Sequence, residues 1–147
     1  MTFHAMSDLA ESACVNPPSW FGECWGLYAE VSLCKDLKVH LLHPDPETGT
    51  DEDISTLSKL RDLAKRIAQE GKDPSLNDMA SRNKKNITSW DVAKGVDLIA
   101  WLAVDQPDAL AKAMKACRHK PFLEGFPQGF EGWTDADLDL AWRTAMK

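Results

Sequence analysis

A single all-α domain of about five to seven helices is predicted by the sequence, on three observations. The segment 88–104 is the most apolar stretch of the chain, and it is apolar enough to lie at the centre of a small core. Apolar residues recur at helical spacing in further segments, among them 54–67 and 107–117. The length of 147 residues is close to the usual size of one domain, and no linker divides it. We therefore expect 1–147 to form one helical domain.

The central helix is expected over 89–104, with the other helices packed around it. Thr88 or Ser89 can cap the free N–H groups of its first turn. Lys94 and Asp97 interrupt the apolar run before it reaches the ~20 residues that a bilayer requires. We therefore expect a core helix and no membrane span.

Two helices are expected before residue 35. The first begins near Ser7 and cannot continue past Pro17 and Pro18. The second begins at Ser19, because large apolar residues follow it at helical intervals. Residues 27–33 also alternate between apolar and polar, as in a half-buried strand. If 27–42 forms strands, the fold becomes α+β.

The segment 43–53 is predicted to be an acidic loop, because it combines two prolines, a glycine and several carboxylates. Its last acids, Asp51 to Asp53, are expected at the head of an amphipathic helix that ends at Gly71. Asp73 and Pro74 predict the cap and first position of a short helix, followed by a basic loop over 82–86.

The C-terminal third is predicted to hold two helices separated by an irregular segment. Asp105 or Gln106, followed by Pro107, predicts a helix start. The segment 121–133 mixes large aromatic residues with glycines, so we expect a loop without regular structure. Thr134 and Asp137 have the spacing of a capping box at the start of the final helix.

The charge is distributed unevenly along the chain. The net charge is −6, but the middle segment 59–120 is basic and both ends are acidic. This layout indicates either complementarity within the molecule or a dipolar surface that orients a partner. A basic face could combine Arg82, Lys84 and Lys85 with Lys94 and the lysines near Lys112–Lys120. The overall acidity argues against nucleic acid as the partner, since phosphate contacts dominate that affinity.

The cysteines predict neither a metal site nor a disulfide framework. The first residues lack the features of a secretory signal, so we expect a cytoplasmic protein with reduced thiols. A metal site from Cys and His side chains lacks the close Cys pairs that structural zinc sites use. The residues of that alternative are Cys14, Cys24, Cys34, Cys117 and His119. We also find no catalytic motif, and we expect no cofactor.

Two surfaces are candidates for binding another protein. Aromatic residues beside flexible glycines can anchor a partner, or the same loop can fold back and cover the core. The aromatic candidates are Phe122, Phe126, Phe130 and Trp133. The acidic candidates, which could dock on a basic partner, are Asp45, Glu47, Asp51, Glu52 and Asp53.

The sequence therefore favours a non-enzymatic protein-binding module, such as a small acidic cytosolic regulator, inhibitor, adaptor or immunity-type protein. The alternative is a small metal-binding protein or enzyme that uses Cys117, His119 and the N-terminal cysteines.

Overall fold

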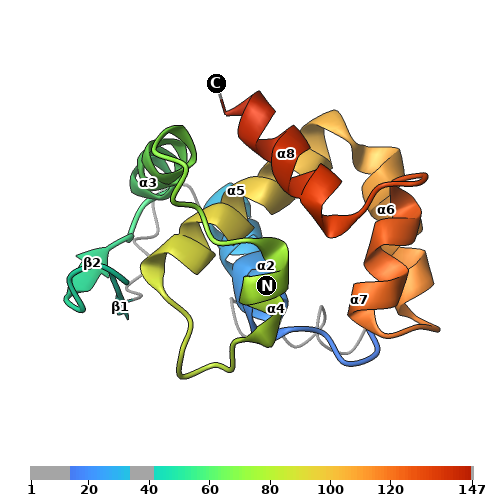
Figure 1. Ribbon diagram of the computed structural model, residues 1–147, viewed down its shortest axis with the longest axis horizontal. Helices are drawn as coiled ribbons and strands as arrows, with labels where there is room; N and C mark the ends of the chain where they lie inside the picture. The colour runs from blue at the N-terminus through green and yellow to red at the C-terminus, as the bar shows by residue number, and fades with distance from the viewer. Residues whose placement is uncertain (1–13, 34–41, 147) are drawn as a thin grey trace.

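The computed structural model describes residues 14–33 and 42–146, and over these residues the fold is helical with one short two-stranded sheet (Figure 1). This confirms the predicted all-α class. The elements in chain order are α2 (Ser19–Leu33), β1 (Leu42–Pro44), β2 (Asp51–Asp53), α3 (Leu57–Gln69), α4 (Leu76–Ser81), α5 (Ser89–Asp105), α6 (Pro107–Cys117), α7 (Phe122–Gly125), the 3-10 turn η1 (Phe126–Gly129) and α8 (Asp135–Ala145).

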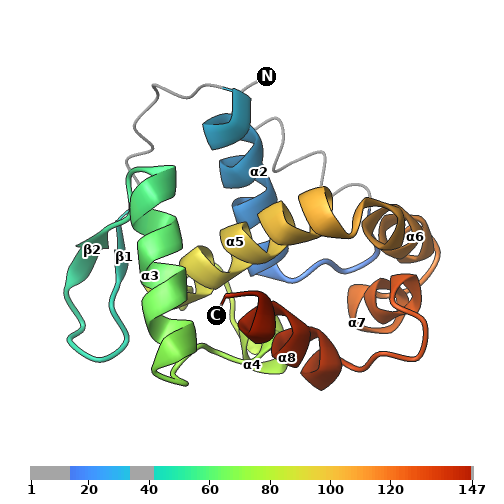
Figure 2. The same cartoon turned by 90° about the horizontal axis from the view of Figure 1, so that it is seen from above.

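Helix α5 lies at the centre of the hydrophobic core, as predicted. Figure 2 shows it running between α2 and α8, with α3 near its N-terminal half and α6 beyond its C-terminal end. Thr88 is the N-cap, and it forms a reciprocal capping box with Asp91. The buried core residues include Val92, Val96 and Leu102, all of which are fully shielded from solvent. Among the described residues, no helix is both long and apolar enough to cross a bilayer.

Helices α2 and α5 pack very closely at Gly95. A Cβ atom at this position would lie 2.5 Å from the Cys24 sulfur and 3.0 Å from the Trp20 ring. Atoms that are not bonded to each other do not approach so closely, so a larger residue would push the two helices apart. The absence of a side chain at Gly95 therefore allows the two helices to pack this closely.

The structure confirms a helix that begins at Ser19. Because α2 continues to Leu33, the strand alternative is wrong for residues 27–33. Residues 34–41 lie outside the described residues, as does the helix expected after Ser7.

The prediction for 43–53 requires correction. Residues 42–53 form an antiparallel hairpin, in which Leu42 pairs with Asp53 and Pro44 with Asp51, so that the predicted loop is limited to residues 45–50. Asp51 to Asp53 therefore belong to a strand, and α3 begins only at Leu57, where Thr56 is the N-cap. Thr56 accepts a hydrogen bond from the backbone N–H of Lys59, so a neutral hydroxyl replaces the acids that the sequence suggested.

The short helix after Asp73 is also capped differently from the prediction. Its N-cap is Ser75, whose hydroxyl accepts a hydrogen bond from the Asp78 N–H, and the helix begins at Leu76. Asp73 instead accepts hydrogen bonds from Lys94 and Arg143 in a buried ion cluster.

The C-terminal third confirms both predicted helices and corrects the segment between them. Helix α6 begins at Pro107, and α8 follows a capping box of Thr134 and Asp137. The segment between them is not irregular throughout, because it contains one turn of α-helix and one 3-10 turn. A Cβ atom at Gly129 would lie 2.3 Å from the Ala109 carbonyl oxygen, so this glycine lets η1 lie directly against α6.

Candidate functional site

The hairpin of residues 42–53, which we call the acidic hairpin, lies at the edge of the molecule beside α3 (Figures 1 and 2). Its loop is closed by backbone hydrogen bonds from Asp45 to the Thr50 oxygen and from Gly49 to the Asp45 oxygen, both 2.8 Å long. Gly49 has a φ of +70°, which glycine adopts without strain. Residues 46–51 are exposed, and Asp45 is partly buried.

The acidic hairpin is fixed to the helices at its base. His43 Nε2 lies 2.6 Å from a carboxylate oxygen of Glu23 on α2, and His43 Nδ1 lies 3.3 Å from the Ile87 carbonyl oxygen. The hydrogen bond with Glu23 raises the pKa of His43. In addition, the Ser89 hydroxyl at the start of α5 donates to Glu52 over 2.9 Å. Contacts from two helices therefore hold both strands in place.

The carboxylates of the acidic hairpin meet cations from α3 and the loop that follows it. Glu52 pairs with Arg66 at 3.3 Å, Glu47 pairs with Lys72 at 2.9 Å, and Asp53 pairs with Lys59. Asp45 instead accepts hydrogen bonds from the N–H groups of residues 47 and 48, which shape the loop. The side chains in these ion pairs are partly solvent-exposed, and such pairs are weak. Part of the predicted charge complementarity is thus internal.

The segment 121–133, which we call the aromatic loop, folds over the hydrophobic core. Phe122, Phe126 and Phe130 are 4%, 3% and 5% exposed, so they cannot serve as exposed anchors for a partner. Each ring packs against the next one along the chain. The ring centroids of Phe122 and Phe126 are 4.7 Å apart, and those of Phe126 and Phe130 are 5.7 Å apart. Trp133 continues this series and is the most exposed of the four, at 37%. The structure therefore favours the alternative in which this segment folds back, because burial removes large apolar surfaces from water.

The cysteine and histidine residues proposed as metal ligands do not converge within the described residues. No group of three or more His, Cys, Asp or Glu side chains in residues 14–33 and 42–146 could hold a metal ion. Cys24 is buried between α2 and α5, where burial raises the pKa of its thiol. His119 is exposed, whereas Cys14 and Cys117 interact with each other. Cys34 lies outside the described residues.

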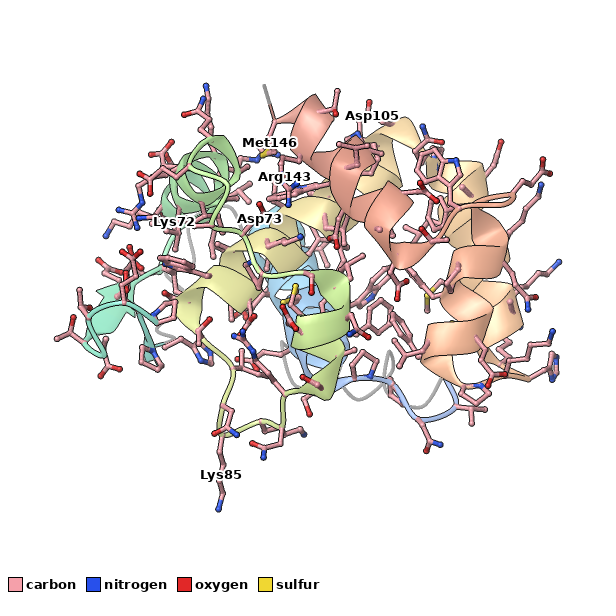
Figure 3. The ribbon with its side chains drawn as sticks, viewed as in Figure 1. Lys72, Asp73, Lys85, Asp105, Arg143 and Met146 are labelled. Carbon is pink, nitrogen blue, oxygen red and sulfur yellow. The ribbon has the colours of Figure 1, made fainter. Side chains whose placement is uncertain are left out.

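A buried ion cluster is the main polar feature that the sequence prediction missed. The Lys94 ammonium group donates to Asp73 at 2.8 Å, to Asp139 at 2.6 Å and to the Pro74 carbonyl oxygen at 2.6 Å. These bonds use all three donors of the ammonium group. Arg143 completes the cluster through two hydrogen bonds to the Asp73 carboxylate, of 2.9 and 3.1 Å. Figure 3 shows Arg143 on α8 and Asp73 on the segment after α3 lying next to each other.

Two cations and two carboxylates balance each other in this cluster. Burial alone would raise the pKa of Asp73, but the hydrogen bonds from Arg143 and Lys94 outweigh it and lower this pKa. Asp139 also accepts a hydrogen bond from the Leu76 N–H at the start of α4. With its donors and acceptors satisfied, the cluster joins α5, α8 and the start of α4, and we assign it a structural role. Lys94 is therefore not part of a basic surface.

Arg82 is also engaged within the molecule. Its guanidinium donates to the Asp91 carboxylate at 2.5 Å and to the Thr88 hydroxyl at 3.3 Å, and so supports the start of α5. Lys85 lies at the tip of the loop before α5, where it points away from the molecule (Figure 3). The predicted basic face thus loses Lys94 to the core, and Arg82 is tied to the capping box.

An open groove runs between α3, α5 and the end of α8. It is lined by apolar side chains that include Trp101, Val104 and Met146, and by charges of both signs. Asp97 lies beside it, where burial raises the pKa of its carboxyl group although the Trp142 indole N–H donates to it at 2.9 Å. The mixed charges select no single partner chemistry. Comparison of the chain with models of protein families, with curated proteins and with solved structures gives no match.

Proposed function

We propose that this chain is a non-enzymatic protein-binding module, a small acidic cytoplasmic regulator, inhibitor or adaptor that docks on a basic surface of another protein. The acidic hairpin is the docking element. The observation that carries this proposal is its arrangement, with residues 46–51 exposed at the edge of the molecule and the base held by α2 and α5.

The charge balance of the acidic hairpin favours a basic partner. The segment 42–53 contains five carboxylates and no Lys or Arg. Three of these carboxylates pair with Lys59, Arg66 and Lys72, in pairs that are partly exposed and therefore weak. A partner's lysine or arginine side chains can compete for the same carboxylates at small cost, and the remaining negative charge steers their approach.

The rigidity of the acidic hairpin also favours binding. Freezing a flexible loop on association opposes affinity, and a loop that is already fixed avoids most of that cost. Here the Asp45 carboxylate accepts two backbone hydrogen bonds inside the loop, and His43 and Glu52 fix the strands to the helices. The exposed acids are thus presented in one arrangement before a partner arrives.

The proposal is tested with a fluorescent arginine-rich peptide as the probe of a basic surface, measured by fluorescence anisotropy at increasing salt. We expect the wild-type chain to bind it with an affinity that falls as salt rises. A variant with Glu47→Gln, Asp51→Asn and Glu52→Gln should lose at least tenfold in affinity. The same variant should recover fewer basic proteins from a cell lysate.

A matched control separates the acidic hairpin from general charge. Asp108→Asn, Glu124→Gln and Glu131→Gln remove the same number of negative charges at exposed positions on and after α6. This control should bind like the wild type. If both triple variants lose affinity equally, the binding reflects net charge and the acidic hairpin has no special role.

A further inference from the structure

Cys14 and Cys117 lie against each other where the segment before α2 meets the end of α6. The N–H of Val15 donates to the Cys117 carbonyl oxygen over 2.9 Å, and the Phe122 N–H donates to the Val15 carbonyl oxygen over 3.0 Å. Val15 is thereby bridged to Pro121 in a parallel arrangement. The backbone of residue 15 is held between the end of α6 and the start of α7.

This backbone arrangement brings the two cysteines within reach of a disulfide. The 2.9 Å bond joins the amide that follows Cys14 to the carbonyl of Cys117, so it places the two Cα atoms close together. Disulfides span Cα separations of roughly 4.4–6.8 Å. Each of the two thiols also shifts the pKa of the other, which is consistent with side chains that lie close together.

The two thiols differ in their environment, which gives them different roles in an exchange reaction. The hydrogen bond from the Cys117 thiol lowers the pKa of Cys14, and the same bond together with burial raises the pKa of Cys117. Cys14 also retains a small exposed area of 8%, whereas Cys117 has none. A thiolate is the attacking species in disulfide exchange, so Cys14 is the residue that reacts first.

We propose that Cys14 and Cys117 form a reversible disulfide when the protein meets an oxidised low-molecular-weight disulfide such as oxidised glutathione. The Cys14 thiolate attacks one sulfur of the oxidant, whose S–S bond breaks, and the released thiolate takes up a proton. Cys117 then gives its proton to water, attacks the Cys14 sulfur and displaces the second small thiolate, which is also protonated. Two protein thiols are oxidised to one disulfide, and the oxidant is reduced to two small thiols.

The disulfide would close a loop of about 100 residues and tie the start of the described chain to α6 and α7. Crosslinks that close long loops restrict the unfolded chain most strongly. Oxidised protein should therefore unfold at a higher temperature than reduced protein, and a reductant should reverse the shift. The structure thus assigns a redox-controlled crosslink to a region that the acidic hairpin does not touch.

The test uses the wild-type protein under native conditions with oxidised glutathione, followed by acid quenching and alkylation of the remaining thiols. Combined cleavage after Glu, Lys and Arg places Cys14 in the peptide 12–23 and Cys117 in the peptide 116–118, apart from the other two cysteines. We expect mass spectrometry to find these two peptides joined, with a mass lower by two hydrogen atoms than their sum. Dithiothreitol should separate them.

Cysteine variants test which two thiols form the crosslink. Cys24→Ala is the matched control, because Cys24 is buried at the α2 and α5 interface, and this variant should still form the crosslink. Cys14→Ser should abolish both the joined peptide and the thermal shift on oxidation. The proposal is overturned if folded wild-type protein leaves Cys14 reduced, carries glutathione on it without proceeding further, or joins it to Cys24 or Cys34 instead.

Discussion

The ammonium group of Lys94 donates to the carboxylate of Asp139 over 2.6 Å inside the core, although the two residues are 45 positions apart in the sequence. The Lys94 side chain has no exposed surface, and the Asp139 side chain is 11% exposed. Water therefore contributes little to the solvation of this pair. Each charge depends on its partners, and the removal of one leaves the others buried without compensation.

Lys94→Met is expected to destabilise the fold by about 3–5 kcal/mol, because it leaves Asp73 and Asp139 as buried anions with too few cations. Urea unfolding followed by tryptophan fluorescence measures this loss. Lys112→Met is the matched control, since Lys112 is 64% exposed and lies 3.8 Å from Glu131. The control should change stability by less than about 0.5 kcal/mol. Equal effects of the two substitutions would contradict the structural role of the cluster.

Phe126→Ala is expected to cost about 3–5 kcal/mol, because it removes a buried ring from the core and leaves a cavity beside Phe122. Leu123→Ala is the control within the same segment, since Leu123 is 51% exposed, and it should cost much less. Differential scanning calorimetry of both variants checks the result. An unchanged thermal midpoint of the Phe126 variant would indicate that this segment lies on the surface and not in the core.

Gly129→Ala is expected to destabilise the protein by about 1–3 kcal/mol through overpacking. The new methyl group would lie 2.3 Å from the Ala109 carbonyl oxygen and 2.6 Å from the Ala113 Cβ, and the backbone oxygen cannot move aside freely. Gln128→Ala, at the exposed neighbouring position, should be nearly neutral. Chemical unfolding of the pair of variants provides the comparison, and a neutral Gly129 variant would show that η1 can move away from α6.

The ion pair of His43 and Glu23 predicts a pH dependence of stability. The carboxylate raises the pKa of His43 in the folded protein, so the folded state holds this proton more tightly than the unfolded state. The stabilisation is fully present below the ordinary histidine pKa of about 6.5, and it is lost as the pH rises through the raised value. Urea midpoints measured from mildly acidic to alkaline pH should show this decline.

The matched variants isolate the contribution of this pair from other titrating groups. Glu23→Gln should flatten the decline above about pH 6.5, since the neutral amide no longer favours the charged imidazole. Glu30→Gln, on the same helix, should keep the wild-type profile. A decline of the same size in the Glu23 variant would mean that another group causes it.

The sequence was most informative where the signal is local. The capping box of Thr134 with Asp137 joins residues three positions apart, and it was predicted and found. For α5 the sequence predicted a cap at Thr88 or Ser89, and the structure places it at Thr88. The start of α6 at Pro107 is also local, because the fixed φ of proline suits the first turn of a helix.

The sequence was least informative where distant residues decide the structure. Asp51 to Asp53 have poor strand propensity, and their strand depends on contacts with residues remote in sequence, such as the bond from Ser89 to Glu52. Lys94 and Asp97 within an apolar helix were the available signal for buried polar contacts, because a charge with apolar neighbours on all faces must be paired. Sequence spacing could not identify the partners, which lie at positions 73, 139 and 142.

The position of Asp139, 45 residues after Lys94 in the sequence, has a consequence for synthesis on the ribosome. Lys94 leaves the exit tunnel well before α8, so a nascent chain that has not yet been extended through residue 139 holds an ammonium group without one of its two counter-ions. Closing the core at that stage would bury an unbalanced charge, which is unfavourable. Final folding should therefore wait until translation has released α8, and stalled shorter chains should be readily digested by proteases.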